Sequence, residues 1–173
     1  MRVLIAVEDE IYAKAIVDFV AAHRWQPGTI FKIVHAVEPS FVGDRITAVY
    51  GADLQNELLR ERTDYGQRLV AFTKETLQSK LDASPPIETN VSIGRAHYVI
   101  LDVAQAWKAD MILLGSHGRT GFSKFLLGSV SMAVLSHADT SCVIVRLPAR
   151  AKEESSKAKE EARPVVKATA IKV

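Results

Sequence analysis

Short continuous apolar runs alternate along this chain with longer segments in which apolar residues recur every three or four positions. A continuous apolar run of about four to eight residues is typical of a strand covered on both faces, as in a parallel sheet. Apolar residues at every third or fourth position share one face of a helix. The pattern therefore predicts strands at residues 3–7, 30–37, 87–93, 111–114 and 142–145, separated by helices.

The helices are predicted from stripes of apolar residues that cover residues 12–23, 54–77, 99–107 and 130–137. Pro27-Gly28 ends the first stripe, and His137 is expected on the buried side of the last. Strands that alternate with helices imply right-handed crossovers and a parallel sheet. We therefore predict an α/β fold with one open five-stranded parallel sheet and helices on both faces.

The stretch from Glu38 to about Ala52 has no clear period and is expected to be a linker. Within it, the part from Phe41 to Tyr50 is apolar with few charges. Long linkers inside compact domains are often functional. Two interpretations stay open: the segment covers a ligand or binds a partner, or it packs on its own helix.

Composition and charge narrow the class of protein. The chain has 173 residues, of which 48% are hydrophobic, enough for the core of one domain. The segment 148–173 carries 7 Lys/Arg and 4 Glu, a net +3, which leaves −1 for residues 1–147. A neutral body argues against sequence-independent nucleic-acid binding. We expect a domain at residues 1–147 and a flexible charged tail at 148–173.

Compartment and cysteine chemistry follow from equally simple features. No apolar run approaches the roughly 20 residues of a membrane span. Met1-Arg2 leads directly into the first strand rather than into a signal peptide, so a soluble cytoplasmic protein is expected. Cys142 lies in an apolar run and is expected to be a buried small hydrophobe without a redox or metal role.

Candidate chemistry concentrates in the loop that follows the fourth strand. In open α/β sheets, ligands bind beyond the carboxyl ends of the strands. Gly115, Gly118 and Gly128 are expected to permit positive φ angles and close approach of backbone N–H groups to an anion. A helix opening at Gly128 would direct its unpaired N–H groups at phosphate, with the Ser129 and Ser131 hydroxyls as further donors. The alternative is that the glycines merely form turns and Ser129 is an ordinary N-cap.

The spacing of these residues is similar to the ATP-binding signature of universal stress proteins. That signature is a glycine, two residues, a second glycine, nine residues, then a glycine followed by Ser or Thr. Gly115, Gly118, Gly128 and Ser129 satisfy it. The resemblance extends over residues 2–147 and implies a Rossmann-like fold of the adenine nucleotide alpha-hydrolase type.

The resemblance also implies a set of nucleotide-contacting positions. Ala6, Val7 and Ala36 would contact adenine, and Gly115, His117 and Gly118 the ribose and phosphates. The complete set consists of Ala6, Val7, Glu8, Ala36, Leu114, Gly115, His117, Gly118, Arg119, Gly128, Ser129, Val130 and Ser131. Arg119 is assigned to phosphate, while Lys124 is left open between phosphate contact and solvated loop charge.

Two positions depart from the family pattern at the end of the first strand. Glu8 stands where the family commonly has Asp, and Glu10 where it has Ser. Glu8 is the candidate Mg²⁺ ligand, directly or through water, although its longer side chain shifts the geometry by about 1.5 Å. The third departure, Asp139-Thr140-Ser141 in place of a proline-containing segment, is interpreted as structural.

The expected function is that of an ATP-binding regulatory protein in the stress response, with ADP or AMP as alternative ligands. By resemblance it would form homodimers through the last strand, from Cys142 to Leu147, and act on a protein partner that the sequence does not identify. Neither a Ser-Gly-Gly loop nor a Gly-x-x-x-x-Gly-Lys-Ser/Thr motif follows a strand, and no nucleophile is spaced suitably around His117. No catalytic residue is assigned, so slow ATP hydrolysis or a protein-binding module without nucleotide are the alternatives.

Overall fold

The computed structural model describes residues 1–39, 44–81, 85–116 and 127–147. Its elements are β1 (Arg2–Ala6), α1 (Glu10–Ala21), β2 (Ile30–Val37), α2 (Asp44–Lys80), β3 (Ile87–Ile93), α3 (Ala96–Trp107), β4 (Met111–Gly115), α4 (Ser129–His137) and β5 (Ser141–Val145). Each predicted strand is present, with ends that differ by one residue at most. The expected flexible tail lies outside the described residues.

The five strands form one parallel sheet in the order β3-β2-β1-β4-β5. The predicted fold class is therefore confirmed. After β3 the chain crosses back over β1, so the strand order reverses at β1. Ala6 at the end of β1 is in register with Val34 of β2 and Leu114 of β4. The carboxyl ends of these three strands border the crevice where ligands bind in open α/β sheets.

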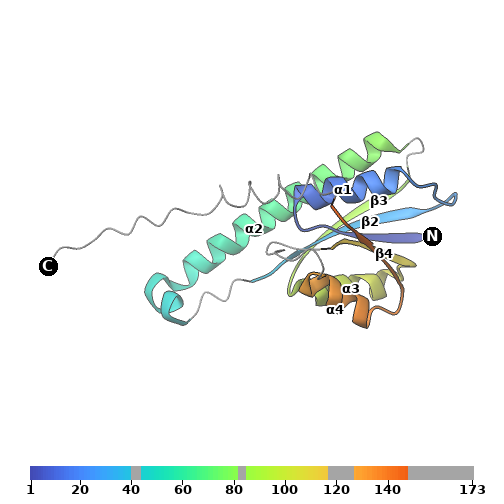
Figure 1. Cartoon of the computed structure of the whole chain (residues 1–173). Helices are drawn as coiled ribbons and strands as arrows, with labels where there is room; N and C mark the ends of the chain where they lie inside the picture. The colour runs from blue at the N-terminus through green and yellow to red at the C-terminus, as the bar shows by residue number, and fades with distance from the viewer. Residues whose placement is uncertain (40–43, 82–84, 117–126, 148–173) are drawn as a thin grey trace.

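The helices form two layers, with α1 and α2 on one face of the sheet and α3 and α4 on the other (Figure 1). Side chains alternate along each strand, so both faces are apolar. Val3 and Ile5 pack in the cluster with α1 and α2, whereas Leu4 and Ala6 pack in the cluster with α3 and α4. Complete burial on both faces explains why β1 is a continuous apolar run.

Helix α2 differs most from expectation. The segment from Phe41 to Tyr50 was predicted to be a linker, but α2 begins at Asp44 and continues for 37 residues, while residues 41–43 lie outside the described part. Its N-terminal half extends beyond the sheet (Figure 1). The described residues of this half are largely polar, and many are good helix formers without a regular apolar stripe. Periodicity detects only the half of a helix that packs on the core, which is why the prediction was wrong.

The terminal histidines of two predicted helical stripes are exposed. His23 lies past the end of α1, and its Nδ1 is 2.6 Å from the carbonyl oxygen of Phe19. His137 ends α4, with Nδ1 2.8 Å from the oxygen of Ala133. In each case the imidazole N–H donates to a carbonyl of the last turn, which has no partner within the helix. The expectation of a buried His137 was therefore wrong.

Cys142 lies among apolar side chains. Cys142 is partly buried against the cluster beneath α3 and α4, and burial raises the pKa of its thiol. A raised pKa keeps the sulfur in the unreactive thiol form at neutral pH. None of the helices in the described segments combines the length and apolar character needed to cross a bilayer.

An ion pair at the sheet edge gives a pH prediction. Lys32 Nζ lies 2.8 Å from Glu88 Oε2 and 4.9 Å from the ring centre of Trp107. The hydrogen bond from Lys32 lowers the pKa of the Glu88 carboxyl below its ordinary 4.5. A pKa that is lower in the folded than in the unfolded chain stabilises the fold above pH 4.5. This contribution is lost as the pH falls through the folded value.

Glu88→Gln should therefore lower the free energy of unfolding at pH 7, and this difference should become smaller as the pH falls towards about 3. The Glu88 side chain is 50% exposed, so solvent screening keeps the difference at pH 7 below about 1 kcal/mol. Urea unfolding of both proteins at the two pH values measures it. An equal difference at both values would contradict the assignment.

Candidate functional site

A cavity of about 670 Å³ opens at the carboxyl ends of β1, β2 and β4. Its volume lies within the range of small-molecule sites, about 300–1,000 Å³. The described residues that line it are Ala6, Val7, Glu8, Tyr12, Val34, His35, Ala36, Val37, Glu38, Glu61, Arg62, Asp64, Tyr65, Arg68, Ala96, Ile100, Leu114, Gly115, Val130 and Ser131. They come from three strands and four helices, so the cavity is a product of the fold rather than of one loop.

One side of the cavity is an apolar slot on the α3 and α4 face of the sheet. We define it by the residues Ala6, Val34, Ala36, Ala96, Ile100, Leu114 and Val130. Three of these are alanines at the ends of β1 and β2 and at the start of α3, where small side chains leave space between sheet and helix. Apolar lining of this kind suits an aromatic ring.

The opposite side is polar and is formed by successive turns of α2. Glu61, Arg62, Asp64 and Arg68 line it. Glu8 and Glu38 add two further carboxylates where β1 and β2 end, and Glu38 contacts both α2 and α3. Among the described lining residues, four carboxylates therefore stand against two guanidinium groups. The charged groups of α2 balance, so the excess of carboxylates comes from Glu8 and Glu38 and would oppose a highly charged anion near the ends of β1 and β2.

His35 lines the cavity and links the end of β2 to the end of β1. It is buried, and its Nδ1–H donates to the carbonyl oxygen of Val7 at 2.9 Å. The ring of Tyr65 meets it edge-on, with centres 5.9 Å apart. A Cβ on Gly66 would lie 2.6 Å from His35 Cδ2, so only glycine lets α2 approach here. His35 is therefore a structural part of the cavity wall.

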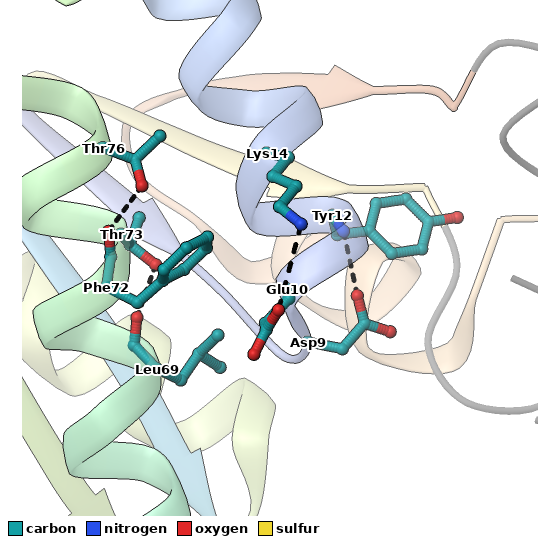
Figure 2. A network of polar contacts seen from close by, with 8 residues as sticks. All are labelled: Asp9, Glu10, Tyr12, Lys14, Leu69, Phe72, Thr73 and Thr76. Atoms are coloured by element: carbon teal, nitrogen blue, oxygen red, sulfur yellow. Dashed lines mark hydrogen bonds and ion pairs between the residues drawn. The ribbon is translucent and has the colours of Figure 1, made fainter. Parts of the chain in front are cut away.

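Tyr12 explains the glycine at the end of β4. Asp9 caps α1 by accepting the backbone N–H of Tyr12 at 2.9 Å, and Figure 2 shows the Tyr12 ring directed away from α2. A Cβ on Gly115 would lie 2.5 Å from this ring. Gly115 was expected to permit a positive φ, but the positive-φ glycines in the described residues are Gly28 and Gly94. Close packing of Tyr12, and not backbone conformation, requires glycine here.

Helix α4 begins at the phosphate end of the predicted site. Gly128 is its N-cap, with φ −61° and ψ 154°, so it is extended rather than left-handed, contrary to expectation. Its N–H donates to the oxygen of Ser116 at 2.7 Å, and the Ser116 N–H donates to Val145 at 2.9 Å. These bonds join the start of α4 to the ends of β4 and β5. The N–H groups of the first turn of α4 are the ones that a helix leaves unpaired.

Ser131 has a different role from the one predicted. Its hydroxyl donates to the carbonyl oxygen of Gly115 at 2.6 Å, and the residue is buried. A hydroxyl has one proton, so while this bond is made Ser131 Oγ has no hydrogen left for a phosphate. The side chain instead ties α4 to β4, and only the backbone N–H of Ser131 remains a candidate phosphate donor.

Ser131→Ala should therefore lower stability more than it lowers ligand affinity. Loss of one buried hydrogen bond costs about 1–2 kcal/mol of unfolding free energy. Thermal or urea unfolding measures this loss, and Ser136→Ala on the exposed side of α4 is the matched control. An unchanged stability with strongly weakened nucleotide binding would show that the hydroxyl serves the ligand.

A sequence model of the universal stress protein family matches residues 1–146. This chain belongs to the universal stress protein family. Universal stress protein A homolog 2 from Coxiella burnetii is 35% identical over 116 residues, which are 66% of this chain and 73% of that protein.

Solved universal stress protein structures share the fold. The MJ0577 protein, solved as a hypothetical protein, superimposes with a TM-score of 0.71 at 21% identity, over 86% of this chain and 96% of that one. More distant structures include a universal stress protein in complex with cAMP, at a TM-score of 0.57 and 18% identity. Another, from Arabidopsis thaliana, has AMP bound and gives a TM-score of 0.56 at 13% identity over 87% of this chain and 94% of that one. At these identities the likeness establishes the fold alone.

The universal stress protein signature and the cavity coincide in part. Eight predicted site residues line the cavity: Ala6, Val7, Glu8, Ala36, Leu114, Gly115, Val130 and Ser131. Gly128 and Ser129 lie at the start of α4 but outside the lining, and Ser129 is exposed as the first helical residue rather than the N-cap. His117, Gly118 and Arg119, together with Lys124, lie outside the described residues. Contact of any of these residues with nucleotide stays a prediction.

The wall formed by α2 was not anticipated from the universal stress protein signature. Its residues Glu61 to Arg68 form no motif and lie far along the chain from the glycine loop. Glu38 and Ala96 were also missed, although both flank predicted strand ends. A search of all strand-end residues, rather than of the glycine loop alone, would have found these two. For α2, the sequence contains no such signal.

The predicted Mg²⁺ ligand Glu8 is part of the cavity lining in this universal stress protein fold. Within the described segments, no three His, Cys, Asp or Glu side chains are grouped so that they could hold a metal ion. A Mg²⁺ ion near Glu8 would therefore take most of its ligands from phosphate and water, as Mg²⁺ commonly does.

Proposed function

We propose that this universal stress protein binds an adenine nucleotide in the cavity at the ends of β1, β2 and β4. ATP is the ligand that the glycine signature implies, with ADP and AMP as alternatives and Mg²⁺ near Glu8 as a companion ion. The observation that carries the proposal is the continuity of the apolar slot with the start of α4. A planar base and a phosphate would find suitable surroundings at the two ends of one cavity.

The chemistry of each end supports this orientation. The backbone N–H groups at the start of α4 favour an anion, because they have no partner within the helix and lie at the positive end of its dipole. Val130 and Ser131 of this turn line the cavity. Ala36 and Ile100 line the far end of the slot, which is apolar and away from the start of α4. The phosphate therefore belongs beside α4 and the base beside β2 and α3.

The biological role we propose is regulatory: nucleotide occupancy would alter dimer or partner contacts during the stress response in the cytoplasm. Strand β5 is at the edge of the sheet, and its residues Cys142, Val143 and Ile144 are only partly buried. An apolar edge strand is a template for pairing with another chain. This supports a homodimer through residues 142–147. The start of α4 adjoins β5, so a change there on nucleotide binding would be passed to the partner subunit.

A second candidate function is a protein-interaction module that holds no nucleotide. The excess of carboxylates over guanidinium groups on the described lining favours it, since it opposes a polyphosphate. Slow hydrolysis of ATP through Glu8 and bound water is a further candidate, and turnover of about 1 per second or faster would favour an enzyme.

Calorimetric titration with ATP, ADP and AMP separates these functions, with and without Mg²⁺. We expect saturable binding of at least one nucleotide. A nucleotide retained through purification and identified by mass would show the resident ligand directly. No binding of any of the three at about 1 mM, equivalent to about −4 kcal/mol, would reject the nucleotide proposal.

A further inference from the structure

Glu38 occupies a defined position at the end of the apolar slot. It directly follows β2 and lines the cavity next to Ala36 and Ala96. Its Oε1 accepts the backbone N–H of Ala96 at 2.8 Å, where α3 begins. Its own carbonyl oxygen accepts a hydrogen bond from Arg62 Nη1 of α2 at 3.0 Å. Contacts from both helix layers thus hold this residue, so its carboxylate is placed before any ligand arrives.

The order of strands places Glu38 at the base end of a bound nucleotide. A phosphate at the start of α4 lies beside β4, while Glu38 follows β2 on the other side of β1. Two strand spacings separate these positions, about 10 Å. This matches the reach of a nucleoside monophosphate from its phosphate to the far edge of its base.

The carboxylate of Glu38 selects among bases by hydrogen-bond chemistry. An ionised carboxylate only accepts hydrogen bonds, and one oxygen already serves the Ala96 N–H. The second oxygen can accept from an exocyclic amino group. At the C6 edge adenine presents such an amino donor, whereas hypoxanthine and guanine present a carbonyl oxygen, which a carboxylate repels. Guanine has its amino group at C2, so GMP could place that donor at Glu38 only by binding with its base in a different orientation.

We propose that Glu38 is the specificity-determining residue that makes this cavity select adenine over 6-oxopurines. The inference rests on the proposed nucleotide site and adds the base-reading group. Glu8 is the rival candidate, because it lines the same cavity at the end of β1. Glu38 is favoured by its position between Ala36 and Ala96, at the end of the slot that would hold the base.

The experiment compares AMP with IMP, which differ at C6, and includes GMP. Wild-type protein should bind AMP about tenfold or more tightly than IMP or GMP, the size expected for one hydrogen bond to a charged group. Glu38→Gln keeps an acceptor for the Ala96 N–H and adds an amide donor. This variant should lower the affinity for AMP, raise the affinity for IMP and bring the two affinities to within about threefold of each other.

Two further variants make the result specific to this residue. Glu8→Gln should preserve the preference for AMP over IMP, and Glu75→Gln, an exposed position on α2 away from the cavity, should change neither affinity. Melting curves of all variants test whether the fold is retained. We expect that it is, because a glutamine side chain in place of Glu38 still accepts the Ala96 N–H at the start of α3.

The outcomes separate this inference from the proposed function. AMP and IMP binding with equal affinity, GMP binding as tightly as AMP, or loss of the preference in Glu8→Gln but not in Glu38→Gln would overturn the role of Glu38. The nucleotide site would stand in each of these cases. No binding of AMP, ATP or IMP would overturn both.

Discussion

Ala36→Phe should lower the affinity for AMP and ATP by about 100-fold or more while leaving the fold intact. Ala36 is partly buried on β2 and lines the slot, so a benzyl group there would fill the space proposed for the base. A lost base contact of about 3 kcal/mol corresponds to roughly 100-fold in dissociation constant. Titration calorimetry measures the loss, and circular dichroism verifies the fold.

The matched control places the same side chain on the sheet away from the cavity. Thr89 is exposed on β3 and is not among the lining residues, so Thr89→Phe should leave nucleotide affinity unchanged. If Ala36→Phe binds AMP as tightly as the wild type, the slot does not hold the base. A loss in both variants would point to a general effect of added apolar surface.

Gly115→Ala is expected to produce the largest loss of stability among the substitutions considered, because it places a methyl group where the Tyr12 ring packs. The new Cβ would lie 2.5 Å from Cδ1 and 2.9 Å from Cε1 of that ring, closer than atoms can approach. Tyr12 is buried and cannot move aside freely. Overpacking of this kind costs about 1–3 kcal/mol of unfolding free energy. Urea unfolding measures it, and nucleotide affinity should also fall as the ring shifts at the cavity wall.

A double-mutant cycle tests whether Tyr12 is the cause. Tyr12→Leu removes the ring, so the cost of Gly115→Ala should be smaller in this background than in the wild type. Equal costs in both backgrounds would show that the glycine is needed for another reason, such as its backbone conformation.

Several features of the site were predictable because they rest on local chemistry. The start of α4 follows a glycine that forms its cap, and the residues at the ends of β1, β2 and β4 are read from where apolar runs stop. Eight of the predicted residues accordingly line the cavity. Where the prediction assigned a reason rather than a place, it was less accurate: Gly115 and Gly128 do not have positive φ, and the Ser131 hydroxyl bonds to Gly115.

The pattern of apolar runs was sufficient for the sheet, the order of elements and the helix layers. Buried strands must be continuously apolar, and strands joined by helices must run parallel. The glycine spacing was sufficient for the family. Neither indicated that α2 begins at Asp44 or that it supplies one wall of the cavity.

That wall and the placement of Glu38 depend on contacts between residues far apart in the chain. Glu38 meets Ala96 across 58 positions and Arg62 across 24. Such contacts leave no period or motif, because each partner is locally an ordinary polar or small residue. Local spacing therefore located the start of α4, the proposed phosphate end, whereas packing of α2 and α3 around the end of β2 created the end that we propose reads the base.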